Sequence, residues 1–90
     1  MTTLREADLA HFFHPQTNLA AHAGTGPHII VSGEGVFLWD EGGSRYLDGM
    51  AGLWCVGLGY SEPRLVEAAR RQMERLPYLQ SFAGRAHEPG

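Results

Sequence analysis

Apolar and polar positions alternate most clearly in the middle of the chain. Two runs rich in β-branched and aromatic residues, HIIVS and VFLWD, are joined by Gly-Glu-Gly, and SRYLD follows Glu-Gly-Gly. Runs of this composition predict strands, and glycine at such joints supplies the positive φ that tight hairpin turns require. The pattern therefore predicts a three-stranded antiparallel meander over residues 28–32, 36–40 and 45–48. Such a sheet needs another layer packed on its apolar face.

Helical spacing of apolar residues marks two further segments. READLAHFF predicts a short helix over residues 3–12, which a His-Pro pair terminates. A longer helix is expected to begin with Ser61 as its N-cap, with Pro63 in the first turn, and to end at Pro77. Its apolar stripe consists of Leu65, Ala69, Met73 and Leu76.

Three segments show neither the two-residue alternation of a strand nor the 3.6-residue spacing of a helix. HPQTNLAAHAGTGP is rich in turn-forming residues and predicts an extended connection, and YLQSFAGRAHEPG predicts a loop. DGMAGLWCVGLGY, residues 48–60, carries four glycines and also a Leu-Trp-Cys-Val run. Aromatic residues beside glycines would form the walls of an apolar pocket, and core packing is the alternative for each of Trp54, Tyr60, Tyr78 and Phe82.

Composition narrows the class of protein. The 90 residues are 43% hydrophobic and 19% charged, which predicts a globular chain. A net charge of −3 disfavours nucleic acid or an anionic membrane as the main partner. A single cysteine, no signal-like segment and no membrane-length apolar run predict a cytoplasmic protein. All seven basic residues are arginine, so this chain has no lysine for a Schiff base or a phosphate.

Few side chains are candidates for direct chemistry. Three Gly-x-Gly pairs lack the third glycine of a dinucleotide fingerprint, so we interpret those at Gly24 and Gly33 as turn glycines and leave the pair at Gly57 open. The histidines are scattered, apart from His11 and His14, and predict no metal site. Cys55 lies among apolar neighbours, which predicts a buried, unreactive thiol.

One long run is more specific than any of these motifs. GVFLWDEGGSRYLDGMAGLWCVGLGYSEPRLVEAARRQMERLPY, residues 35–78, resembles the N-terminal region of class III pyridoxal-phosphate-dependent aminotransferases of the ω-amino acid or amine–pyruvate transaminase type. Less strict matches extend the resemblance over about residues 8–89. The resemblance implies an α+β segment of a fold-type-I transferase that is α/β when complete. Residues 1–90 would hold a leading helix, the meander, an active-site loop and a following helix, and the large domain that binds pyridoxal phosphate would lie outside them.

The resemblance implies substrate-binding roles and no catalytic residue in this chain. Leu53 and Trp54 would line the pocket for the amine donor, and Phe82 would reach into the partner subunit's pocket of a homodimer. Position 16 usually carries an aromatic residue in the family, so Gln16 implies a more polar pocket edge, and Gly57 replaces a common asparagine. The substrates would be a small amine and pyruvate or another keto acid, and pyridoxal phosphate would be bound by residues outside this chain.

Two alternatives remain open at this point. The same fold could serve a semialdehyde aminomutase or a γ-aminobutyrate transaminase, although GLWCV favours the pyruvate-linked type. A stand-alone binding module would instead use Trp54, Tyr78 and Phe82 to hold a small molecule or a protein. Such a module would hide its apolar surface and melt cooperatively, whereas an aminotransferase segment would leave the meander and the helix stripe partly uncovered.

Overall fold

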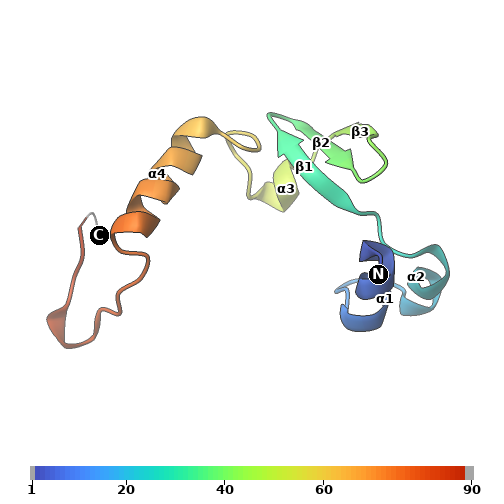
Figure 1. Cartoon of the computed structure of the whole chain (residues 1–90), viewed down its shortest axis with the longest axis horizontal. Helices are drawn as coiled ribbons and strands as arrows, with labels where there is room; N and C mark the ends of the chain where they lie inside the picture. The colour runs from blue at the N-terminus through green and yellow to red at the C-terminus, as the bar shows by residue number, and fades with distance from the viewer. Residues whose placement is uncertain (1, 89–90) are drawn as a thin grey trace.

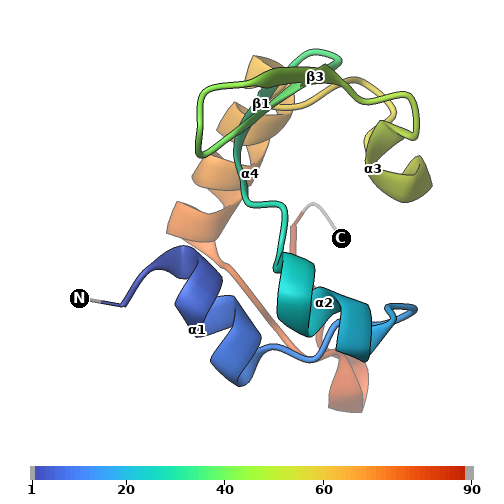
Figure 2. The same ribbon diagram turned by 90° about the vertical axis from the view of Figure 1, so that its right-hand side faces the viewer.

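The computed structural model describes residues 2–88 and contains helices and one small sheet (Figure 1). The elements in chain order are α1 (Leu4–His11), α2 (Leu19–Thr25), β1 (Ile30–Glu34), β2 (Phe37–Asp40), β3 (Arg45–Leu47), α3 (Ala51–Trp54), α4 (Pro63–Arg75) and the 3₁₀ turn η1 (Phe82–Gly84). Helices α1 and α2 neighbour each other beyond one end of the sheet, and α4 extends away from its other side (Figures 1 and 2). This arrangement confirms the predicted α+β class with its leading helix, meander and following helix.

The three strands form the predicted antiparallel meander in the order β1-β2-β3. The prediction for β1 lies two residues too early, because Gly33 and Glu34 pair with Leu38 and Phe37 and leave a tight turn. Gly35 has a φ of 60° in that turn, where glycine adopts the left-handed conformation without steric cost.

Asp40 shapes the second turn of the meander. Its carboxylate accepts hydrogen bonds from the backbone N–H groups of Gly42 at 3.0 Å and Ser44 at 2.9 Å, and from the Tyr46 hydroxyl at 2.8 Å. These donors hold the pKa of Asp40 below its usual range, with the Ser44 N–H as the largest cause. Asp40 is therefore a turn residue, whose carboxylate closes the connection between β2 and β3.

The first residues of the helices follow capping rules, but the prediction left out α2 and placed the N-cap of α4 one residue too early. Thr3 and Glu6 form a capping box at α1. The extended connection predicted after residue 14 is wrong, because this stretch contains α2, which Asn18 caps by accepting from the Ala21 N–H at 3.1 Å. An N-cap followed by Leu-Ala-Ala is a helix signal that the surrounding turn formers obscured.

Helix α4 begins one residue later than predicted. Its N-cap is Glu62, whose side chain accepts from the Arg64 N–H, while Ser61 adopts a φ of 57°. The Ser61 hydroxyl donates instead to the carbonyl of Gly33 at 2.6 Å. Ser61 therefore ties the start of α4 to β1 and leaves the capping to its neighbour.

No residue among 2–88 is fully buried. The accessible surface is 7642 Å², against about 5200 Å² for a compact protein of this mass. The radius of gyration is 18.1 Å, against about 12 Å for a compact domain of this length. On the α4 stripe Leu65 is 55% exposed and Met73 is 66% exposed. The uncovered apolar surface agrees with a segment of a larger fold and contradicts the stand-alone module.

Burial corrects one further expectation. Cys55 is exposed, and its thiol donates to the carbonyl of Leu53 at 3.3 Å, so the expected burial of this thiol is wrong for the described chain. The apolar neighbours of Cys55 along the sequence do not cover it, and Leu53 and Trp54 are themselves exposed. None of the described helices is both long and apolar enough to cross a membrane.

Candidate functional site

The glycine-rich segment at residues 48–60 contains a single turn of left-handed helix. The φ angle is positive at four successive residues: 48° at Ala51, 59° at Gly52, 60° at Leu53 and 69° at Trp54. The turn is closed by hydrogen bonds from the Trp54 N–H to the Met50 carbonyl at 3.0 Å and from the Cys55 N–H to the Ala51 carbonyl at 2.9 Å. A left-handed conformation costs about 1–2 kcal/mol for each residue with a Cβ. Backbone strain of this kind is concentrated at functional sites in proteins.

Asp48 holds this turn by its backbone N–H groups, and Tyr60 in turn holds Asp48. The Asp48 carboxylate accepts hydrogen bonds from the N–H groups of Met50 at 3.1 Å and Gly52 at 2.8 Å, and a short one from the Tyr60 hydroxyl. These bonds, the one from Tyr60 above all, keep the pKa of Asp48 below its usual range. The same contact raises the pKa of Tyr60, because the carboxylate favours the protonated phenol. The sequence analysis assigned Asp48 to a strand end and missed this anchoring role.

Tyr60 also fixes the segment against the sheet. Gly35 and Tyr60 exchange two backbone hydrogen bonds, of 3.1 Å and 2.8 Å. A Cβ at Gly33 would lie 2.9 Å from Cβ and Cγ of Tyr60, and a Cβ at Gly59 would lie 3.0 Å from the Gly35 carbonyl oxygen. In these two Gly-x-Gly pairs, Gly35 therefore serves the tight turn, and Gly33 and Gly59 allow the close approaches to Tyr60 and to Gly35.

A hollow of about 510 Å³ lies between the segment and the β1–β2 turn. Its lining includes Val36, Asp48, Ala51, Val56 and Tyr60. Leu53 and Trp54 do not belong to this lining, and these residues are 59% and 88% exposed. The left-handed turn thus presents its two large apolar side chains outside the contacts made within residues 2–88.

The structure places the four predicted substrate-binding residues in three separate regions. Leu53 and Trp54 are adjacent in α3, Gln16 lies in the turn between α1 and α2 with a φ of 48°, and Phe82 begins η1 and is 80% exposed. Figure 1 shows α3 near the middle, the α1–α2 pair at one end and the segment after α4 at the other, in a chain 52 Å long. Only Leu53 and Trp54 are brought together, so a shared pocket stays a prediction.

Comparison with known proteins identifies the family. The family model for aminotransferase class-III matches residues 19–89. The putrescine–pyruvate aminotransferase of Pseudomonas aeruginosa is 46% identical over 79 residues, which cover 88% of this chain and 17% of the relative. The mitochondrial γ-aminobutyrate transaminase 1 of Oryza sativa subsp. japonica is 49% identical over 63 residues, which cover 70% of this chain and 12% of the relative.

Solved structures agree with the sequence comparison. The omega transaminase of Pseudomonas jessenii, in complex with PMP, matches with a TM-score of 0.93 at 41% identity, covering 98% of this chain and 19% of that one. The (S)-enantioselective omega-transaminase of Thermomicrobium roseum matches with a TM-score of 0.91 at 50% identity, covering 96% of this chain and 19% of that one. The chain therefore belongs to the class III aminotransferases, and its fold is part of a transaminase fold. It spans less than a fifth of the length of each of these relatives.

The residues present do not by themselves fit pyridoxal phosphate. The chain contains no lysine to form a Schiff base. At Gly33 and Gly59 the protein's own atoms fill the space that a phosphate group would need, since a Cβ there would lie 2.9–3.0 Å from Tyr60 or Gly35. No step of cofactor chemistry can be assigned to this chain alone.

Proposed function

We propose that this chain shapes the amine-donor side of the active site in a class III aminotransferase whose remaining parts bind pyridoxal phosphate. The observation that carries this proposal is the left-handed turn Ala51–Trp54, which Asp48 and Tyr60 anchor. The turn is strained and yet leaves Leu53 and Trp54 exposed, so its conformation does not serve burial within residues 2–88. A rigid aromatic wall held in this way is suited to limiting the size of a substrate beside it.

A relative supports the same role for Trp54 and adds Phe82. One thermostable omega transaminase variant, engineered for asymmetric synthesis of enantiopure bulky amines, carries substitutions of a tryptophan and of a phenylalanine 28 positions later. Trp54 and Phe82 are separated by the same 28 positions. Because Phe82 lies at the far end of the chain from α3, we place it in the pocket of the partner subunit in a homodimer. Gln16 would make another edge of the pocket polar.

The complete enzyme would transfer an amino group from an ω-amino acid or amine to pyruvate or another keto acid, in the cytoplasm. Bound pyridoxal phosphate would supply the electron sink for this reaction. The residues of this chain would bind and orient the amine. A relative named for pyruvate, the putrescine–pyruvate aminotransferase, matches 88% of the chain, which supports pyruvate as the amino acceptor.

A chimera tests the proposal. Residues 2–88 would replace the matched segment of the Pseudomonas jessenii omega transaminase, and kcat/KM would be measured for a small and a bulky amine with pyruvate. We expect Trp54→Gly to raise the ratio of kcat/KM, bulky over small amine, by about tenfold or more, because the indole no longer fills the slot.

Leu58→Ala is the matched control, because Leu58 is an exposed apolar residue of the same segment. We expect it to leave the ratio unchanged. An active chimera in which Trp54→Gly and Leu58→Ala have the same effect on the ratio would refute the proposed role of Trp54.

A further inference from the structure

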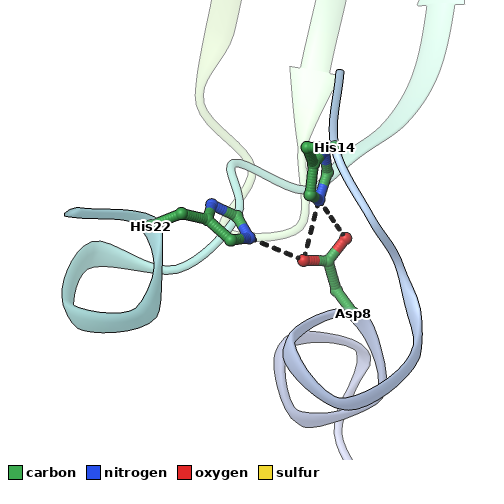
Figure 3. A group of neighbouring side chains, drawn as sticks. All are labelled: Asp8, His14 and His22. Atoms are coloured by element: carbon green, nitrogen blue, oxygen red, sulfur yellow. Dashed lines mark hydrogen bonds and ion pairs between the residues drawn. The ribbon is translucent and has the colours of Figure 1, made fainter. Parts of the chain in front are cut away.

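Three side chains that the proposed function does not use converge beside α1 and α2. Asp8 lies on α1, His14 lies in the connection and His22 lies on α2 (Figure 3). The Nε2 atom of His14 is 2.8 Å from Oδ1 and 2.9 Å from Oδ2 of Asp8, and Nε2 of His22 is 3.0 Å from Oδ2. The sequence pattern paired His14 with His11 and left His22 among the scattered histidines, because the helix that carries His22 was not predicted.

We infer that Asp8, His14 and His22 form a binding site for a divalent transition-metal ion of the Zn²⁺ type. One ligand atom from each residue lies within 4.8 Å of the other two, so a single ion can reach all three. Bonds of about 2.0–2.2 Å at tetrahedral angles place ligand atoms about 3.3 Å apart. The N···O distances of 2.8–3.0 Å therefore need to open by only a few tenths of an ångström.

The donor set selects the kind of ion. Two imidazole nitrogens and one carboxylate oxygen suit Zn²⁺, Co²⁺ or Ni²⁺, whereas Ca²⁺ and Mg²⁺ require mostly oxygen ligands. The side chains of Asp8, His14 and His22 are 16%, 28% and 14% exposed, so an ion can enter from solvent. Three protein ligands leave a fourth position for water.

The site is assembled before an ion binds. The Arg5 guanidinium on α1 donates to the carbonyl oxygens of Thr25 at 2.6 Å and Gly24 at 3.3 Å at the end of α2. This contact joins the two helices independently of the histidines. An ion would therefore not have to supply the free energy for bringing α1 and α2 together.

The imidazole nitrogens that face Asp8 can also change from hydrogen-bond donors to metal ligands. In the ion-free cluster each Nε2–H donates to the carboxylate of Asp8. An ion requires the Nε2 lone pair, and a neutral imidazole provides it when its proton moves to Nδ1.

Cobalt titration of the chimera tests this inference. The protein would be prepared without a histidine tag, treated with chelator and titrated with Co²⁺, with binding followed by visible absorption and calorimetry. We expect one Co²⁺ per chain at this site beyond any bound by the parent transaminase. Because losing a residue that only supports a metal ligand costs about 10- to 100-fold in affinity, we expect His22→Ala and Asp8→Asn each to cost at least about 100-fold.

His11→Ala is the matched control, since His11 is an exposed histidine of α1 outside the cluster. It should leave the Co²⁺ affinity unchanged. The same titrations on the 90-residue chain repeat the comparison without the large domain. Absence of a cobalt spectrum in both proteins, or an equal loss in His11→Ala and His22→Ala, would overturn the inference. Transaminase activity does not enter this readout, so the result is independent of the proposed function.

Discussion

Replacing Gly52 with alanine should damage the left-handed turn that presents Leu53 and Trp54. Gly52 has a φ of 59°, and a Cβ there would lie 2.7 Å from Cγ2 of Val56 and 3.2 Å from the Tyr60 hydroxyl. A contact of 2.7 Å cannot persist, so either Val56 or the turn itself has to move.

Two contributions set the size of the effect. The left-handed conformation costs alanine about 1–2 kcal/mol. Overpacking against Val56 adds about 1–3 kcal/mol. The total is about 2–5 kcal/mol. If the enzyme has to supply 2 kcal/mol of this total to restore the turn when it binds the transition state, kcat/KM for the amine falls by about 30-fold.

The assay compares four variants of the chimera: Gly52→Ala, Val56→Ala, the double variant and Gly57→Ala. Val56→Ala removes the methyl group that the new Cβ would strike, so the double variant should recover part of the lost kcat/KM and thermal stability. Gly57→Ala is the control, because a Cβ at Gly57 meets nothing within 4 Å. If Gly52→Ala and Gly57→Ala behave alike, the turn does not position the substrate wall as we argue.

Four further predictions concern the sheet, the anchor, α2 and the isolated chain. Gly33→Ala should lower the free energy of unfolding of the chimera by about 1–3 kcal/mol, because its Cβ would lie 2.9 Å from Tyr60; denaturant unfolding measures this, and no loss would contradict the close approach. Because the hydrogen bond from Tyr60 above all holds the folded pKa of Asp48 below its ordinary value of 3.8, the stabilising contribution of Asp48 is present above that value and is lost as pH falls through the folded pKa. Tyr60→Phe should move this pKa upward, which an NMR titration of the carboxyl carbon would detect. Gly24→Ala should slow amide exchange in α2 by about two- to fivefold, since its Cβ meets nothing within 4 Å and alanine favours helix by about 0.5–1 kcal/mol. The 90-residue chain alone should bind a hydrophobic dye and melt without a sharp transition, and a sharply melting monomer would contradict the segment interpretation.

Much of the secondary structure follows from local rules, because caps and turns depend on residues a few positions apart. The Thr3–Glu6 capping box, Pro63 at the start of α4 and the glycines around β2 place these elements within about two residues. The family resemblance likewise rested on GLWCV and its neighbours, and the comparisons confirm it.

Other features depend on how distant segments approach one another, and local spacing does not encode that approach. The left-handed turn of α3 cannot be predicted from the spacing of apolar residues. Its φ angles are held by Asp48, which is bonded in turn to Tyr60, twelve residues after it in the chain. The convergence of Asp8 and His22, 14 residues apart, requires α2 and the turn before it. Residue types at 48–60 marked a special segment in advance. The direction in which Trp54 points, and the exposure of Cys55, arise only when the backbone of that segment is closed in three dimensions.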